Sequence, residues 1–129
     1  MRIAAFLAIC LGFTGAAHAA PVTLICNGSM TADGNQIPIN GETAILDIEN
    51  NSFKPPMYTE HPLIRIEANN ISFGFESDKY STSGSLDRVS GSLAMTVMKP
   101  EERKKLKAGG SAHFLVWMSG KCVPALRMF

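Results

Sequence analysis

The sequence lacks the short motifs that usually identify an activity. Its 129 residues contain no G-x-S-x-G nucleophile elbow, no C-x-x-C pair and no M-x-x-M-x-x-M series. These absences remove the usual signatures of an α/β-hydrolase, a thiol redox pair and a methionine-rich copper site. No motif therefore assigns an activity, a cofactor or a metal to the chain.

Long hydrophobic runs are also missing. The apolar stretch at positions 3–13 is 11 residues long, whereas a membrane-spanning helix needs about 20. It follows Arg2 and leads to Ala17-His18-Ala19, which places small residues where a signal peptidase reads them. We predict that residues 1–19 are a cleaved signal peptide. Residues 20–129 would then form one exported domain, periplasmic or secreted, without an integral membrane span.

A surplus of one charge is missing once the predicted signal is removed. The sequence has 12 Lys and Arg against 11 Asp and Glu, so the loss of Arg2 leaves 11 of each sign. The basic run at 104–107 directly follows Glu101 and Glu102, which offset its charge. Without a basic face there is no electrostatic basis for a nucleic-acid partner.

Cysteine is scarce, with three residues in all, and Cys10 belongs to the predicted signal. Cys26 and Cys122 remain, one near each end of the mature chain. Two cysteines so far apart in an exported protein favour a disulfide, because metal and redox pairs usually lie close in sequence. We predict a Cys26–Cys122 disulfide, with a metal or redox pair as the alternative.

The secondary-structure signal is β. Ile71, Phe73 and Phe75 alternate with polar residues or glycine in the period-two pattern of a half-buried strand. Asp33-Gly34 is a hairpin turn pair, and Pro38 indicates an edge or irregular strand. The predicted strands are 22–26, 36–40, 43–49, 63–67, 71–76, 92–97 and 113–118. This pattern predicts a mainly β fold, a small antiparallel sandwich or open barrel of consecutive hairpins.

One short helix is expected near 100–108. Proline and acidic residues begin this segment, lysines fill its last turn and two glycines end it. Its apolar residue Leu106 is expected to pack on Leu115 and Trp117, the second apolar face of the last predicted strand. Because one leucine cannot cover both, we expect an apolar patch beside Trp117 that is open to a ligand or partner.

A tetrapeptide repeat, S-G-S-L, occurs at 83–86 and again at 90–93. We interpret the two copies as the arms of one hairpin. Asp87 would accept backbone N–H bonds in the turn, and Gly91 would adopt the left-handed conformation that ends it. Asp87 and Gly91 are therefore predicted to be structural turn residues.

The longest predicted loop, 50–62, contains three prolines and three large apolar residues. Two interpretations stay open. The apolar side chains form a binding surface, or Phe53 and Met57 plug one end of the β domain. The candidate binding surface consists of Phe53, Met57, Tyr58, Leu115 and Trp117.

The L-D-R-V-S-G turn at 86–91 and the ending of a cysteine, a proline and R-M-F resemble small exported proteins of soil-dwelling alphaproteobacteria. In that group an early cysteine also follows the signal, as Cys26 does here. The group has no assigned activity, so the resemblance implies no catalytic residue. The charged segment 99–108 departs from the group's pattern.

Three functions are compatible with these features. The first is a non-enzymatic exported β domain that binds a partner protein or a small apolar ligand. The second is a structural or stress-related envelope protein without a discrete site. The third is a small hydrolase, which would need His61 or His113 in a cleft beside a carboxylate.

Overall fold

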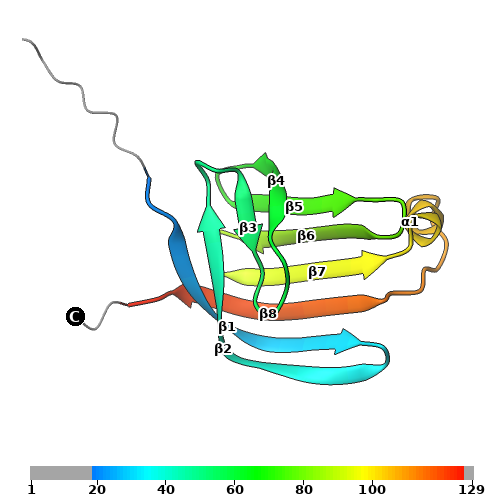
Figure 1. Ribbon diagram of the computed structural model, residues 1–129, viewed down its shortest axis with the longest axis horizontal. Coiled ribbons are helices and arrows are strands. Elements are labelled where there is room, and N and C mark those ends of the chain that lie inside the picture. The colour runs from blue at the N-terminus through cyan, green and yellow to red at the C-terminus, as the bar shows by residue number, and fades with distance from the viewer. Residues whose placement is uncertain (1–18, 127–129) are drawn as a thin grey trace, which may run out of the picture.

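The computed structural model describes residues 19–126; residues 1–18 of the predicted signal peptide and the R-M-F ending lie outside the described residues. Eight antiparallel strands and one helix follow one another along the chain (Figure 1). They are β1 (Val22–Ala32), β2 (Asn35–Asp47), β3 (Ser52–Lys54), β4 (His61–Ile66), β5 (Asn70–Glu76), β6 (Ser81–Asp87), β7 (Ser92–Met98), α1 (Pro100–Lys107) and β8 (Val116–Pro124). The mainly β class, the consecutive hairpins and the short helix are confirmed.

Of the two predicted alternatives, sandwich and open barrel, the structure has the barrel, and the barrel is closed. Each strand pairs with its neighbours in sequence, and β8 returns to pair with β1. That last ladder runs from Leu24 opposite Pro124 to Ala32 opposite Val116. Period-two alternation reports which face of a strand is buried but not which strand lies beside it. The closure was therefore not visible in the sequence pattern.

Several strands are longer than predicted. β1 continues past residue 26 to Ala32, and β2 pairs with it through the Asp33-Gly34 turn. Asp33 and Gly34 have φ angles of 50° and 75°, the positive values that this kind of tight hairpin turn requires. Pro38 lies opposite Ser29, in the part of β2 that has only β1 as a neighbour. Its position in an edge segment is as expected, because no second strand needs its missing N–H.

The last strand is also displaced from its predicted position. β8 begins at Val116 rather than at 113, and it continues through Ser119, Gly120 and Lys121 to Pro124. These polar and small residues gave no strand signal in the sequence. They form a strand because β1 and β7 flank β8 and supply partners on both sides.

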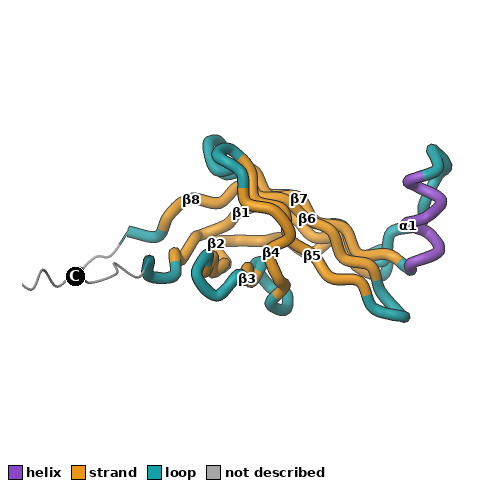
Figure 2. The backbone as a smooth tube through the Cα atoms, turned by 90° about the horizontal axis from the view of Figure 1, so that it is seen from above, coloured by secondary structure: helices purple, strands orange, loops and turns teal. Residues whose placement is uncertain are grey.

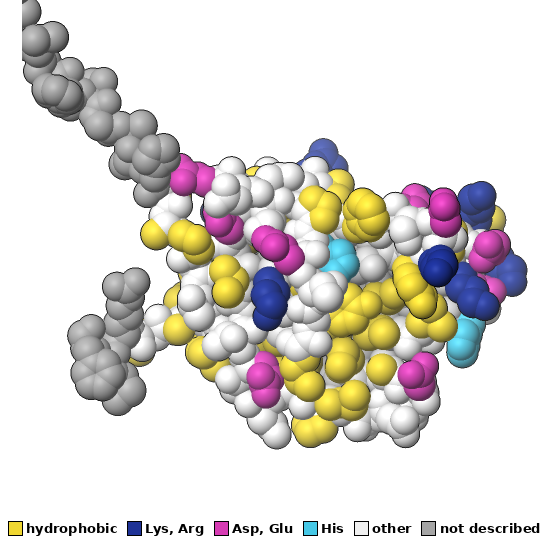
Figure 3. All heavy atoms as spheres, in the orientation of Figure 1, with side chains coloured by type: hydrophobic (Ala, Val, Ile, Leu, Met, Phe, Trp, Pro, Cys, Tyr) yellow, Lys and Arg dark blue, Asp and Glu magenta, His cyan; other side chains and the backbone are white. Residues whose placement is uncertain are grey.

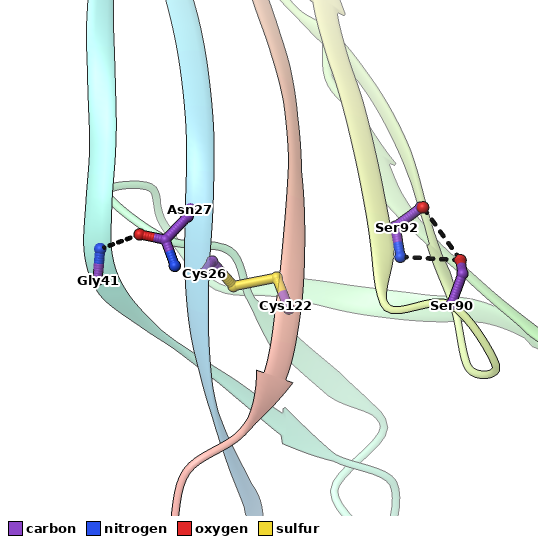
Figure 4. Close-up of a disulfide and its surroundings, with 6 residues drawn as sticks. All are labelled: Cys26, Asn27, Gly41, Ser90, Ser92 and Cys122. Atoms are coloured by element: carbon purple, nitrogen blue, oxygen red, sulfur yellow. Dashed lines mark hydrogen bonds between the residues drawn. A yellow bond between two sulfur atoms is a disulfide. The ribbon is translucent and has the colours of Figure 1, made fainter.

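The disulfide is confirmed and lies on the closing ladder. Cys26 and Cys122 are directly opposite each other in β1 and β8, with their Cα atoms 4.1 Å apart (Figure 4). Next to it, the register of β1 against β2 shifts between Cys26 and Asn27. The Asn27 Oδ1 atom accepts a 2.9 Å hydrogen bond from the Gly41 amide at this irregularity. The covalent link thus joins the first and last strands of the barrel.

The core fills the inside of the barrel with apolar side chains from every strand. Phe53 and Phe73 meet at its centre with ring centroids 4.7 Å apart. The Phe73 ring occupies the space where a side chain on Gly84 would stand. The other buried members are Leu24, Cys26, Met30, Ile39, Ala44, Leu46, Leu63, Ile71, Leu86, Leu93, Met95, Val97, Met118 and Cys122.

The strands differ in length, so the barrel is covered unevenly. β3 and β4 are short and lie over one half of the sheet, while β5 to β8 continue past them toward α1 (Figure 1). Figure 2 shows α1 beyond the ends of β5, β6 and β7, standing off the sheet. β3 and β4 therefore do not cover the ends of the long strands on the side of the helix.

The sequence had suggested that Leu106 anchors the helix. In the structure a charged residue, Arg103, anchors it. No residue of α1 is buried, and Leu106 and Trp117 remain 40% and 54% exposed. Instead, the Arg103 guanidinium donates to the side-chain and backbone oxygens of Ser81 and Thr96 over 3.0–3.3 Å. Burial lowers the pKa of Arg103 from its ordinary value, but the group stays charged at neutral pH.

Removing the disulfide tests the role of the closing ladder. We expect Cys122→Ser to lower the free energy of unfolding by roughly 2–5 kcal/mol, the range for native bridges in small exported domains. Adding Cys26→Ser to that variant should change stability little, because the bridge is already gone. Urea unfolding of the mature protein checks both variants. Two free thiols in the unreduced, denatured wild type would contradict the bridge.

The 87–91 turn offers a sharper comparison. Gly91 has φ of 79°, its carbonyl accepts the Cys122 amide at 2.8 Å, and a side chain on it would overlap the Cys122 carbonyl oxygen. We expect Gly91→Val to cost more than the 1–3 kcal/mol or so typical of a strained backbone. Ser90→Ala removes only exposed hydrogen bonds of the hydroxyl, with Ser92 and with the Asp87 carboxylate, and should cost at most about 1 kcal/mol. Equal thermal midpoints would contradict this account of Gly91.

Candidate functional site

Four loops and strand ends converge at the open, helix-side end of the barrel. They enclose a cavity of about 250 Å³, which we name the tyrosine mouth. Its lining residues are Ala32, Asp33, Tyr58, Tyr80, Val97, Leu115 and Val116. Figure 3 shows a broad area of hydrophobic side chains on this face, where the long strands emerge from under β3 and β4. The mouth is thus part of an apolar surface.

The aliphatic wall of the mouth is built by the end of β7 and the start of β8. Val97 is buried, and Val116 packs against the same core. The Leu115 amide donates a 2.8 Å hydrogen bond to the Val97 carbonyl, which fixes Leu115 beside β7 just before β8 begins. This wall is a direct extension of the core, so its position is set by the barrel.

Tyr58 reaches the mouth because the β3–β4 loop bends sharply. Pro55 and Pro56 are buried, and Met57 has a positive φ of 59°. The Tyr58 amide then donates to the Pro55 carbonyl at 3.4 Å, which closes a turn. The prolines hold the loop down while the bend at Met57 directs Tyr58 toward the cavity.

His61 supports Tyr58 from one side. The two rings are stacked, with centroids 5.6 Å apart and an interplanar angle of 17°. The buried His61 ring has its Nδ1 atom 2.7 Å from the Thr59 carbonyl. A carbonyl oxygen can only accept, so Nδ1 carries the proton and donates. The imidazole therefore acts as a fixed platform for one face of the tyrosine.

Tyr80 is presented by the β5–β6 turn. The Ser77 hydroxyl oxygen accepts the amides of Lys79 and Tyr80 at 3.4 and 3.1 Å, and the Ser77 amide donates to the Tyr80 carbonyl at 2.8 Å. Tyr80 is 53% exposed. The turn holds its backbone by internal hydrogen bonds and leaves the side chain at the entrance of the mouth.

Tyr80 acts electrostatically on Tyr58. Burial of the phenol raises the pKa of Tyr58 above its ordinary value, and the neighbouring Tyr80 raises it further. Asp33, in the β1–β2 turn, is the one charged side chain among the described residues that line the mouth. The mouth therefore combines an aliphatic wall, two phenols and one carboxylate.

The predicted binding residues lie in four different places. Tyr58 and Leu115 are brought together in the mouth. Phe53 is in the core, and Trp117 lies opposite Thr31 and Thr96 on the outer side of the barrel wall. Met57 is 43% exposed at the bend beside Tyr58. Both interpretations of the 50–62 segment therefore apply to part of it. Phe53 and the two buried prolines plug the barrel, whereas Tyr58 belongs to a surface cavity.

Sequence reasoning missed Tyr80, Asp33 and Val97 as members of this site. Asp33 was interpreted only as part of a hairpin turn, Val97 belongs to an ordinary strand pattern, and no prediction was made for residues 77–80. The local signal that was available is an aromatic residue directly after a polar turn. Alternation of the antiparallel strands puts the β1–β2 and β5–β6 turns at the same end of the sheet, and closure of the barrel brings them around one cavity.

Other cavities are present, and some of them also hold charged side chains, such as Asp87 and Arg88 in one lining and Arg103 and Lys107 in another. A second cavity, of about 260 Å³, lies at the opposite end beneath the 87–91 turn, with Leu24, Leu46 and Leu86 in its lining. Within residues 19–126, no group of three His, Cys, Asp or Glu residues is placed to hold a metal ion. In the same part of the chain, no helix has the length and hydrophobicity to cross a membrane.

No protein-family model, no curated protein and no solved structure matches the chain significantly. The candidate site is therefore defined by its geometry alone.

Because the chain has only two tyrosines, the mouth can be titrated directly. In Tyr80→Phe the single remaining phenol is Tyr58. Its pKa, followed by absorbance at 295 nm, should stay above the ordinary value because burial is the larger cause, but fall below that in the wild type. Because this pKa is raised on folding, the associated stability is present at neutral pH and lost as the pH rises through the folded-state pKa. An ordinary pKa for Tyr58 in the variant would mean that it points into solvent.

Proposed function

We propose that this protein is a non-enzymatic, exported binding module that holds one small apolar group of a ligand or partner protein in the tyrosine mouth. The observation that carries this proposal is the convergence of Tyr58 and Tyr80 with Val97, Leu115 and Val116 around one cavity. Aromatic and aliphatic walls with a few polar groups are the usual composition of binding pockets.

The size of the mouth limits what it can hold. At about 250 Å³ it is smaller than the pockets of roughly 300–1,000 Å³ that enclose drug-sized ligands. It suits a single side chain or a molecule of a few carbon atoms. Larger partners would insert one group and rest on the surrounding surface.

Preorganisation supports binding at this site. The disulfide-closed barrel fixes Val97 and Val116, and internal hydrogen bonds fix the turns that carry Tyr58 and Tyr80. Such a site loses little conformational freedom when it is occupied. Tyrosine also provides a large contact area with only two rotatable side-chain bonds.

The histidines favour binding over hydrolysis. Within the described residues no carboxylate is hydrogen-bonded to the ring of His61 or His113. His61 uses Nδ1 on a backbone carbonyl, and His113 contacts Glu102 through its backbone amide at 3.0 Å. The oriented base that activates a nucleophile is therefore not assembled at either histidine.

Export is consistent with the same proposal. A buried disulfide between two strands that are far apart in sequence is typical of proteins that fold in an oxidising compartment. The predicted signal at 1–19 directs the chain to such a compartment. We infer that the mouth faces periplasmic or extracellular partners.

Binding of n-pentanol, followed by NMR, tests the proposed function. We expect saturable shifts of the Ala32, Val97 and Leu115 methyl groups with a dissociation constant in the millimolar range, where 1 mM corresponds to about −4.1 kcal/mol. Leu115→Asn should weaken binding about fivefold, because it removes roughly 1 kcal/mol of apolar contact. Ile48→Asn, at an exposed position outside the mouth, is the matched control. Absence of saturation, or equal binding by both variants, would contradict the proposal and favour an envelope protein without a discrete site.

A further inference from the structure

We propose that the group received by the tyrosine mouth is the side chain of a lysine on a partner protein. This inference rests on the proposed function and names its ligand. The mouth presents a carboxylate, two phenols and an aliphatic wall, and a lysine presents an ammonium group on a four-carbon stem.

Charge is the first argument. Asp33 is the one charged lining residue, and within residues 19–126 its carboxylate has no ion pair or hydrogen bond with another side chain or amide. By comparison, Asp87 accepts the amides of Val89 and Ser90, and Glu102 accepts the His113 amide and pairs with Lys105. Asp33 is thus an exposed carboxylate at the edge of the cavity, open to a partner from outside the chain. The complementary ligand is a cation.

The tyrosines strengthen that preference. The face of an aromatic ring is electron-rich and attracts an ammonium group that lies within about 6 Å of the ring centroid. Tyr58 stacks on His61, packs against the core and also lines the cavity. Tyr80 adds a second ring in the same lining. The phenol oxygens also accept hydrogen bonds from an ammonium.

The aliphatic wall selects the stem and the head group. Val97, Leu115 and Val116 line the mouth continuously with Ala32, so methylene groups would be buried beside the core. Lysine and arginine both bury such stems and keep their heads at a polar end. A planar guanidinium needs partners for five N–H donors, whereas an ammonium needs three. Asp33 and the two phenols match the smaller number.

Two exposed apolar residues, Met57 and Phe114, which we name the rim, point to a protein as the source of the lysine. Met57 and Phe114 are each 43% exposed, and each is the chain neighbour of a lining residue, Tyr58 and Leu115. A free alkylammonium would fill the mouth and leave this rim in water. A protein surface with apolar residues on either side of the lysine would cover both, and the exposed hydrophobic area in Figure 3 is of the kind that partners bury.

Ligands with the same stem and different heads test the charge preference. In NMR titrations at low salt, n-pentylammonium should bind about tenfold more tightly than n-pentanol, which corresponds to 1.4 kcal/mol. Asp33→Asn should bring the ratio of the two dissociation constants close to one, because asparagine suits the same turn position but carries no charge. Asp78→Asn, in the β5–β6 turn and outside the lining, should keep the preference.

These outcomes separate the inference from the proposed function. Equal binding of n-pentanol and n-pentylammonium, or an unchanged preference in Asp33→Asn, would contradict the proposal of a cationic ligand. The proposed binding function would still stand. Failure of both ligands to saturate overturns the binding function itself.

A second titration tests the protein source with a five-residue peptide that has lysine between two leucines. It should bind at least about tenfold more tightly than n-pentylammonium, because it also contacts the rim. Replacing its lysine by norleucine or acetyl-lysine should remove that gain. Phe114→Ser should weaken the peptide and leave n-pentylammonium unchanged. If the peptide binds no better than n-pentylammonium, the proposal that the lysine belongs to a partner protein is contradicted, and a free alkylammonium is the ligand.

Discussion

The rest of the structure depends on the pairing of the first strand with the last. β1 and β8 meet along their whole facing length, and Cys26 and Cys122 link them at one point of that ladder. Gly28 lies opposite Gly120 on the same ladder, and a side chain on Gly28 would overlap the backbone of β8. Glycine is needed there because the two strands approach so closely. Without this closure the two ends of the sheet would be open edges, and the core would lose one wall.

The candidate site follows from the same closure combined with unequal strand lengths. The β1–β2 turn, which carries Asp33, and the start of β8, preceded by Leu115, lie at one end only because β1 and β8 run antiparallel. The short β3 and β4 leave the inner face of the longer strands open at that end. A closed, filled barrel thus acquires a cavity at one end without an empty core. Tyr58 and Tyr80 occupy the opening from the loops on the other side.

The charged helix is connected to the site by the contacts of Arg103 and Glu102. Arg103 ties α1 to β6 and β7, and the Glu102 carboxylate accepts the His113 amide. That amide and the pairing with Lys105 lower the pKa of Glu102, so the carboxylate stays ionised at neutral pH. Both contacts fix the chain that leads into Phe114 and Leu115. A helix that buries no residue therefore serves the site by holding the connection that forms one wall of the mouth.

The sequence by itself determined the elements that depend on neighbouring residues. Alternation of apolar and polar residues predicted strands such as β5 and β7, the acidic start and basic end predicted α1, and Asp87 and Gly91 define the turn that the structure contains. Only the tertiary structure decided the barrel closure, the extension of β8 through Ser119 and Gly120, and the meeting of Asp33, Tyr58 and Tyr80. Local patterns report the conformation and the buried face of a segment. They do not encode which distant segment lies beside it, and both the closing ladder and the tyrosine mouth are made of such distant pairs.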